Sequence, residues 1–266
     1  MNTLTNKIII STRPLIEDDQ IKSHLTAKGA QVLDFPMIRT ECVELSENIK
    51  TVFAGLNDFE WIVFTSKNGV ICFYDLLKQV GVDESILSDR KIAVMGKATG
   101  DEVVKRGGNA HLISSGRTAE DLLVEIKREI QLTDKVLLAL GELAEDKLET
   151  GLNGSCQTER INVYKTIDLE YTTNEIIDRI KDDKYDIILF TSPSGFGNFY
   201  KIMFANNIVT AFRIACIGTT TEKEMLKYNC QPLVVSPKSD VESFANAIEK
   251  YLASPNPSQG GEYEKV

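Results

Sequence analysis

Hydroxyl-bearing residues follow most of the apolar segments of this chain, in positions typical of oxyanion-binding loops. Each such loop precedes a helical pattern, where free backbone N–H groups and the positive end of a helix dipole would face a ligand. This chemistry suits carboxylate, phosphate or sulfate groups. The loops are 11–13, 65–69, 96–99, 114–118, 191–195, 218–221 and 236–239. Any single loop is explained better as ordinary helix capping, but the whole set favours an anion-lined cleft.

The usual catalytic signatures are missing, which narrows the chemistry. The sequence contains no GxGxxG or GxxxxGK[ST] loop, so dinucleotide and nucleoside triphosphate reactions are disfavoured. It contains no GxSxG or HExxH motif, and its two histidines, His24 and His111, are interpreted as structural. Tyr164 ends a predicted strand, where its phenol could donate a hydrogen bond or act as a weak acid. A buried structural tyrosine explains it equally well.

Strand-like and helix-like patterns alternate along the whole chain. The strand candidates are continuous Ile, Val, Leu and Phe runs, as expected for a parallel sheet covered on both faces. Amphipathic helical spacing occurs between them, for example over 118–130 and 240–252. The strand candidates are 7–11, 30–35, 60–65, 91–95, 109–113, 135–140, 157–163, 185–190, 213–217 and 231–235. This alternation predicts a doubly wound α/β fold.

An internal repeat organises these elements. The segment WIVFTS at 61–66 matches IILFTS at 187–192, at an offset of 187 − 61 = 126 residues. The segment KIAVMG at 91–96 matches RIACIG at 213–218, at an offset of 213 − 91 = 122 residues. The chain therefore reads as two copies of one five-stranded unit.

Two divisions of the chain into domains remain open. The segments 35–40 and 161–166 occupy equivalent positions in the two copies, and neither has a helical pattern. If both are crossovers, one domain is 40–165 and the other combines 1–38 with 168–252. A head-to-tail split near residue 130 is the simpler alternative. The last residues, 253–266, contain Pro, Gly and Ser without periodicity and are expected to form a disordered tail.

Composition limits the classes of partner. The 266 residues are 42% hydrophobic and 26% charged, which is typical of a globular protein. The net charge is −9 and there is no basic block, so neither nucleic acid nor an anionic membrane surface is an expected partner. The same charge argues at first sight against a strongly anionic substrate. No apolar run approaches the roughly 20 residues that span a bilayer, and no signal peptide is recognisable.

The cysteines indicate a reducing compartment. There are five, widely separated and without a CxxC pair, so neither a disulfide framework nor a zinc site is expected. We therefore expect a cytoplasmic protein.

The order and spacing of these motifs resemble uroporphyrinogen-III synthase over about residues 7–252. The resemblance lies in segments 11–14, 35–41, 64–69, 96–99, 163–166, 190–195 and 217–221. It implies two flavodoxin-like, doubly wound parallel domains of five strands each, internally duplicated and joined by a two-stranded antiparallel ladder. It also implies the crossover division, with domains 1–38 plus 168–252 and 40–165.

The resemblance implies a lyase of tetrapyrrole (haem) biosynthesis that needs no cofactor. Such an enzyme cyclises hydroxymethylbilane, with inversion of ring D, to uroporphyrinogen III and water. The implied route passes through azafulvene and spirocyclic pyrrolenine intermediates in an interdomain cleft. The implied protein is a monomer that receives its substrate from hydroxymethylbilane synthase. The main alternative is a two-lobed cytoplasmic binding protein or sensor for a small anionic ligand.

The resemblance also assigns site residues. Tyr164 matches the tyrosine that assists departure of the substrate hydroxyl, while Thr99, Ser192, Thr220 and Thr221 match residues that contact the substrate. Backbone and side-chain groups of the same loops would hold its acetate and propionate groups. These further binding candidates are Thr12, Arg13, Thr65, Ser66, Lys67, Asn68, Gly96, Ser194, Gly195 and Gly218.

Overall fold

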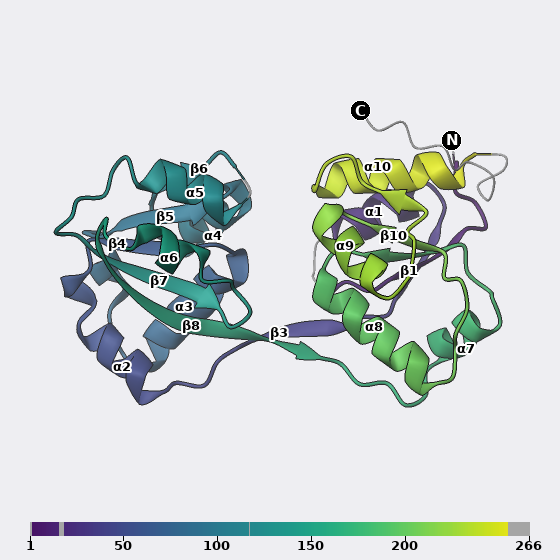
Figure 1. Cartoon of the computed structure of the whole chain (residues 1–266), viewed down its shortest axis with the longest axis horizontal. Helices are drawn as coiled ribbons and strands as arrows, with labels where there is room; N and C mark the ends of the chain where they lie inside the picture. The colour runs from purple at the N-terminus through teal and green to yellow at the C-terminus, as the bar shows by residue number, and fades with distance from the viewer. Residues whose placement is uncertain (1, 16–18, 117, 255–266) are drawn as a thin grey trace. The chain divides into compact units, whose positions relative to one another are not determined.

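The computed structural model describes residues 2–15, 19–116 and 118–254, and its chain divides into two compact units (Figure 1). The discontinuous unit comprises residues 1–39 and 167–266, and the continuous unit comprises residues 40–166. Most of the tail expected to be disordered, 255–266, lies outside the described residues. No helix in the described ranges is long and apolar enough to cross a membrane.

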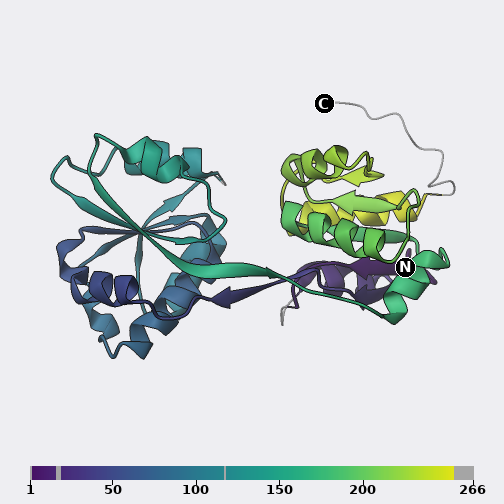
Figure 2. The same cartoon turned by 60° about the horizontal axis from the view of Figure 1, so that its bottom comes forward.

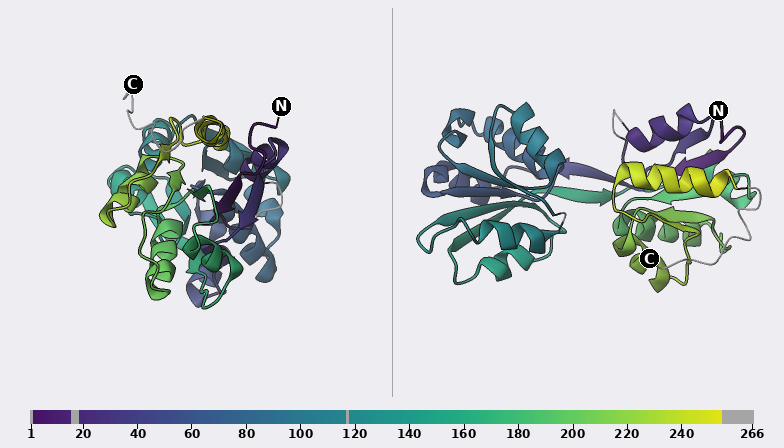
Figure 3. Two further views of the ribbon diagram at one scale, coloured as in Figure 1. Left: turned by 90° about the vertical axis from the view of Figure 1, so that its right-hand side faces the viewer. Right: turned by 90° about the horizontal axis from the view of Figure 1, so that it is seen from above.

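The discontinuous unit is built on a five-stranded sheet in the order β11-β10-β9-β1-β2, with parallel neighbours throughout. Its strands are β1 (Ile8–Ser11), β2 (Gln31–Asp34), β9 (Ile187–Phe190), β10 (Ile214–Cys216) and β11 (Val234–Val235). Its helices are α1 (Gln20–Ala27), α7 (Glu175–Lys181), α8 (Pro193–Ala205), α9 (Thr219–Lys227) and α10 (Val241–Leu252). Helices α1 and α10 pack on one face of the sheet, and α7, α8 and α9 pack on the other (Figure 3).

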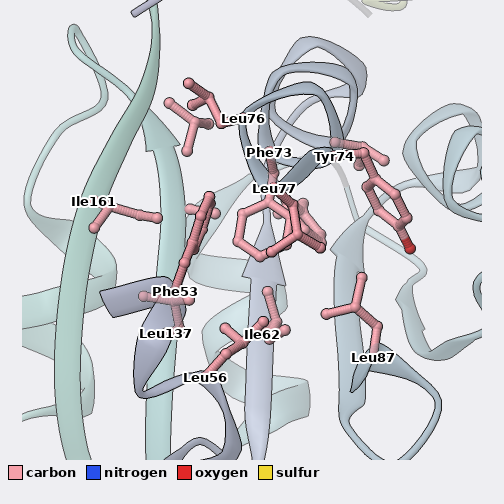
Figure 4. Packing of buried hydrophobic residues seen from close by; sticks show 14 of the residues in the cluster. Phe53, Leu56, Ile62, Phe73, Tyr74, Leu76, Leu77, Leu87, Leu137 and Ile161 are labelled. Atoms are coloured by element: carbon pink, nitrogen blue, oxygen red, sulfur yellow. The ribbon is translucent and has the colours of Figure 1, made fainter. Parts of the chain in front are cut away.

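The continuous unit is built on a six-stranded sheet in the order β3-β8-β7-β4-β5-β6. Its strands are β3 (Ile38–Cys42), β4 (Trp61–Phe64), β5 (Lys91–Met95), β6 (Ala110–Ser114), β7 (Lys135–Gly141) and β8 (Gln157–Asp168). Its helices are α2 (Glu47–Ala54), α3 (Lys67–Gln79), α4 (Lys97–Lys105), α5 (Ala119–Ile126) and α6 (Lys147–Leu152), with short 3-10 turns η1 (Leu56–Asp58) and η2 (Glu84–Leu87). Helices cover both faces (Figure 2), and α3 buries Phe73, Leu76 and Leu77 against the strands (Figure 4).

Strands β3 and β8 run in opposite directions along the edge of this sheet. The Val43 amide donates to the Val163 carbonyl, and the Leu169 amide donates to the Met37 carbonyl. Residue numbers therefore rise along β3 as they fall along its partner. The chain enters the continuous unit along β3 and leaves it along β8.

The two sheets share one topology. Strands β1, β2, β9, β10 and β11 lie in the spatial order 2-1-3-4-5, and strands β7, β8, β4, β5 and β6 lie in the same order. This is the flavodoxin-like arrangement. Helices α3 and α8 both have 13 residues, and α4 and α9 both have nine. The α/β fold predicted from the sequence is confirmed by these parallel sheets.

The predicted strands all overlap observed ones, but the apolar-run pattern missed β3, which only the family resemblance anticipated as part of a two-stranded antiparallel ladder. Its sequence, Ile-Arg-Thr-Glu-Cys, has a charged or polar residue at three of five positions, so it lacks the continuous apolar run used to find the others. An edge strand needs no such run, because much of it stays near solvent. Three of its residues are only half-buried.

The expectation of no disulfide is wrong for Cys42 and Cys72. Their sulfur atoms are bonded, with the Cα atoms 5.1 Å apart. The bond joins the end of β3 to the middle of α3 across 30 residues of sequence. Cysteine spacing could not reveal it, because only the tertiary fold brings these two elements together. Cys156, Cys216 and Cys230 carry free thiols.

Candidate active site

Each sheet reverses its strand order at one point, and ligands of open α/β proteins bind beyond the carboxyl ends of strands there. In the continuous unit this point lies between β4 and β7, which are neighbours in the sheet. Thr65 and Ser66 follow β4, and Gly141 ends β7. In the discontinuous unit the equivalent point lies between β1 and β9, which Thr12 and Ser192 follow.

A register shift in β8 sets the position of Tyr164. Leu140 pairs with Asn162, but the next residue of β7, Gly141, pairs with Tyr164, so one residue of β8 is skipped. Such irregularities re-aim side chains near functional sites. A Cβ atom built on Gly141 would lie 2.4 Å from the Tyr164 ring, so only glycine leaves room for the phenol. Tyr164 is half-buried in this position.

Ser66 connects Tyr164 to the start of α3. Its hydroxyl accepts a hydrogen bond from the Gly69 amide at 3.0 Å, which caps the helix. The same hydroxyl donates to the Tyr164 hydroxyl oxygen at 3.0 Å. A serine hydroxyl has one proton, and here that proton is directed at Tyr164. The proton of Tyr164 is therefore available to another acceptor.

Lys67 is held beside the first turn of α3 by a buried carboxylate that the sequence did not single out. Its ammonium lies 3.6 Å from Glu102, whose side chain is only 4% exposed. Arg106 approaches the same carboxylate at 3.4 Å. Glu102 lies inside a helical pattern with no motif around it, so only its burial in the fold marks it. Asn68 donates to the Thr40 hydroxyl at 3.2 Å.

The next loop of the continuous unit begins α4. Gly96 precedes the helix with a φ of 76°, a conformation that favours glycine. Thr99, in the first turn of α4, is buried and so packs inside this loop. Thr65 lines a cavity of about 290 Å³, together with Met95, the residue before Gly96. Most of that lining is apolar, from Met95, Leu140, Ala144 and Leu148 among others.

The first loop of the discontinuous unit is tightly fixed. The Thr12 hydroxyl donates to the Leu189 carbonyl at 2.6 Å, and Thr12 is buried. Arg13 lies 3.4 Å from Asp19, the N-cap of α1. Burial lowers the pKa of Arg13, and the nearby Asp19 carboxylate opposes that shift. Its Nη1 atom is buried and has no hydrogen-bond partner in the described part of the chain.

The start of α8 repeats the geometry of the start of α3. The Ser192 hydroxyl accepts a hydrogen bond from the Gly195 amide at 3.1 Å. The Ser194 hydroxyl lies 3.4 Å from the Ser192 hydroxyl. A Cβ atom on Gly195 would lie 2.9 Å from the Ser192 hydroxyl oxygen. Asn198 donates to the carbonyls of Met37 and Leu169, at 2.7 and 2.8 Å, and so ties α8 to both joining segments.

The start of α9 completes this edge of the discontinuous unit. Gly218 caps the helix, and a Cβ atom there would collide with Ser239, at 2.3 Å from its hydroxyl oxygen. Thr220 is exposed and Thr221 is buried. A ligand at this edge would therefore meet Thr220 first, while Thr221 packs beneath it.

Within each unit, the candidate residues thus gather at the carboxyl edge of one sheet. Tyr164 and Ser66 are joined by a hydrogen bond between their hydroxyls, and Ser192 is hydrogen-bonded to Ser194 and Gly195 in the other unit. The other candidate residues lie at or near helix N-termini, where most of them offer hydroxyls or backbone N–H groups, and Lys67 and Arg13 add two cationic side chains. Such an edge can bind carboxylates through backbone N–H groups and can donate one phenolic proton.

Comparison with known proteins identifies relatives of this chain. A sequence profile described as "Uroporphyrinogen-III synthase HemD" matches residues 19–246. The uroporphyrinogen-III synthase of Chlorobaculum parvum is 30% identical over 254 residues, which are 92% of this chain and 99% of that protein. The "Porphyrin biosynthesis protein HemD" of Ruminiclostridium josui is 25% identical over 90% of this chain. The match spans only 47% of the length of that second protein.

Solved structures share the fold. A uroporphyrinogen III synthase mutant from Thermus thermophilus superposes with a TM-score of 0.62 and 15% identity, over 92% of this chain and 98% of that one. The uroporphyrinogen-III synthetase of Helicobacter pylori gives the same TM-score and identity, over 92% and 99%. The chain belongs to the uroporphyrinogen-III synthase family.

Proposed function

We propose that this chain cyclises hydroxymethylbilane to uroporphyrinogen III, with inversion of ring D and release of water. Family membership supports the reaction, and the hydrogen bond between Ser66 and Tyr164 is the observation that carries the chemistry. In this proposal the protein is a monomeric lyase that uses no cofactor and receives its substrate from hydroxymethylbilane synthase.

Tyr164 assists departure of the substrate hydroxyl. The pyrrole nitrogen lone pair pushes out the hydroxymethyl oxygen, whose C–O bond breaks as the phenol donates its proton, so that water leaves. An azafulvene cation remains on the substrate. Ser66 supports the step because its donated hydrogen bond stabilises negative charge that develops on the Tyr164 oxygen.

Ring inversion demands positioning more than acid–base chemistry. The substituted carbon of ring D attacks the azafulvene carbon and forms a spirocyclic pyrrolenine, which fragments and recloses in the inverted sense. In the fragmentation the original bond between this carbon and the bridge to ring C breaks, and the unsubstituted α-carbon of ring D then bonds to that bridge. Loss of the proton from this α-carbon restores the aromatic pyrrole and balances the proton that Tyr164 gave to the departing water. Because the substrate also cyclises unaided to the uninverted isomer, the protein must hold ring D against the electrophilic carbon.

The binding residues hold the acetate and propionate groups of the substrate. Carboxylates at the starts of α3, α4, α8 and α9 would accept hydrogen bonds from backbone N–H groups, so binding needs few cations. This reconciles the net charge of −9 with a substrate that carries eight carboxylates by its chemistry. The proposed set is Thr12, Arg13, Thr65, Ser66, Lys67, Asn68, Gly96, Thr99, Ser192, Ser194, Gly195, Gly218, Thr220 and Thr221.

One experiment separates a synthase from a sensor that only binds the ligand. Freshly generated hydroxymethylbilane is incubated with the protein, the product is oxidised, and the uroporphyrin isomers are resolved by chromatography. We expect predominantly isomer III. Isomer I alone, as in the control without protein, would show that the chain is not a synthase under these conditions and would favour the binding-protein alternative.

A further inference from the structure

A second cavity lies at the opposite edge of the continuous unit's sheet. Its volume is about 490 Å³, and it is bounded by the start of β5 and the turn between α4 and β6. Lys91 lines it, whereas Gly96, at the other end of β5, belongs to the candidate active site. At about 3.3 Å per residue the strand separates the two regions by roughly 16 Å. The cavity is therefore distinct from that site.

Two buried donors at this cavity have no acceptor within the part of the chain that the structure describes. Tyr74, which lines it, is 1% exposed, and its hydroxyl has no hydrogen-bond partner among the described residues. The Nε atom of Arg90, another lining residue, is equally buried and unpartnered there. Burial raises the pKa of Tyr74 to about 12, so its phenol keeps its proton. Figure 4 shows that this hydroxyl points out of the apolar cluster, beside Leu87.

The α4–β6 turn approaches the phenol closely through a glycine. Gly108 stands there, and a Cβ atom built on it would lie 2.5 Å from the Tyr74 hydroxyl oxygen. The neighbouring Gly107 has a φ of 81°, which favours glycine and fixes the turn. A side chain at position 108 would therefore collide with the Tyr74 hydroxyl.

Three cationic side chains surround the space. One edge of the Arg90 guanidinium is fixed, since its Nη1 atom donates to the carbonyls of Asn57 and Phe59, both at 2.9 Å. Arg106 is fixed by Asp75 at 2.6 Å. The Lys91 ammonium lies 5.1 Å from the centre of the Trp61 ring, and no carboxylate of the described residues comes within 4.0 Å of it.

Two acids also line the cavity, but they do not satisfy these donors. Glu84 and Asp89 are both exposed, so water screens their charges. The unpartnered Tyr74 and Arg90 atoms, in contrast, have lost their water and gain most from an acceptor. Burial therefore favours a ligand that accepts hydrogen bonds.

The discontinuous unit provides an internal comparison. At the repeat offsets, Tyr200 corresponds to Tyr74 (200 − 74 = 126), Phe212 to Arg90 (212 − 90 = 122) and Tyr228 to Arg106 (228 − 106 = 122). Both arginines are thus replaced by aromatic residues. The Tyr200 and Tyr228 rings lie 4.6 Å apart and help to fill the space, which leaves a cavity of about 170 Å³.

We propose that the cavity around Tyr74, Arg90 and Lys91 binds a small oxyanion, a phosphate or a carboxylate. Such a ligand accepts hydrogen bonds from the phenol and the guanidinium and pairs with the free ammonium. The cavity, at about 490 Å³, is large enough to hold such an ion. The counterpart cavity in the other unit is smaller and has no charged residue among its described lining, since Arg213, which corresponds to Lys91, does not line it.

The test is an amide NMR titration of the full chain with inorganic phosphate and, separately, with malonate, against chloride at matched ionic strength. We expect saturable shifts at Gly107 and Gly108 with at least one of the two anions, which also distinguishes phosphate from carboxylate. Tyr74→Phe and Lys91→Gln should each weaken binding about tenfold or more. Arg90→Phe, which introduces the residue of the other repeat, should abolish it.

Two controls make the result specific. Lys135 also lies over an aromatic ring, 4.2 Å from the centre of Phe59, but does not line the cavity, so Lys135→Gln should leave binding unchanged. Lys67→Gln at the candidate active site should also leave it unchanged. Absence of saturable shifts with both anions, or their loss in either control, would overturn the proposal. If Arg90→Phe fails to fold, Tyr74→Phe and Lys91→Gln still decide the question.

Discussion

The Ser66 hydroxyl donates a hydrogen bond to the Tyr164 hydroxyl across 98 residues of sequence, with 3.0 Å between the two oxygens. Ser66 is at the same time the N-cap of α3. One residue therefore orients both the start of a helix and the phenol beside it. This coupling makes Tyr164 the first residue to test.

Tyr164→Phe should lower the rate of isomer III formation about 100-fold, the low end of what general-acid assistance contributes. The protein should stay folded, because the ring still packs over Gly141. Initial rates and thermal unfolding measure the two effects. Tyr251→Phe on α10 is the matched control and should keep full activity. Wild-type rates in Tyr164→Phe would remove the tyrosine from the mechanism, and loss of folding would make its role structural.

Gly141→Ala should displace Tyr164, since the added Cβ would lie 2.4 Å from the ring. We expect a loss of about 1–3 kcal/mol in the free energy of unfolding, together with reduced activity. Gly197→Ala on α8 is the control, because its Cβ would come no closer than 3.7 Å to another side chain. In a Tyr164→Ala background the cost of Gly141→Ala should largely disappear. An undiminished cost there would place the clash elsewhere.

Glu102→Gln should release Lys67 from its position beside α3. Removal of one buried charge also leaves Arg106 with Asp75 alone, so we expect a loss of stability of about 1–3 kcal/mol. Because Lys67 is assigned to binding, KM should rise several-fold while kcat changes little. The exposed pair of Lys97 with Asp101 is the control, and Asp101→Asn should change neither constant. A fall in kcat at unchanged KM would contradict the positioning role.

Glu249 should contribute to the acid stability of the discontinuous unit. Hydrogen bonds from Thr3, Lys28 and His24 lower the pKa of its carboxyl from 4.5 to about 2. A pKa that is lower in the folded state stabilises the protein above the unfolded value and is lost as pH falls. This contribution, about 1 kcal/mol for a partly exposed group, should therefore be complete above pH 4.5 and vanish towards pH 2.

Denaturant unfolding of Glu249→Gln across this pH range tests that expectation. The variant should be less stable than the wild type near neutral pH, and the difference should shrink as the pH approaches 2. Glu47→Gln, in an exposed pair with Lys50, should match the wild type throughout. A difference between Glu249→Gln and the wild type that does not vary with pH would rule out this linkage.

The sequence by itself determined where most strands and helices lie and which of the two each segment forms. Continuous apolar runs located the buried strands, and the offset between segments 61–66 and 187–192 revealed the repeat, because such patterns depend only on neighbours along the chain. The sequence did not determine how the chain divides into domains. A head-to-tail split near residue 130 and a discontinuous first domain both fitted it. Tertiary contacts group residues 1–39 with 167–266.

Only the tertiary structure decided which residues meet. The Ser66–Tyr164 hydrogen bond, the Cys42–Cys72 disulfide and the burial of Glu102 each depend on strand order and register, which no local pattern encodes. Tyr164 was a candidate from its place at a strand end, but its partner and the need for Gly141 came from the register shift in β8. Side chains distant in sequence become neighbours through sheet pairing, and pairing is set by the packing of the whole unit.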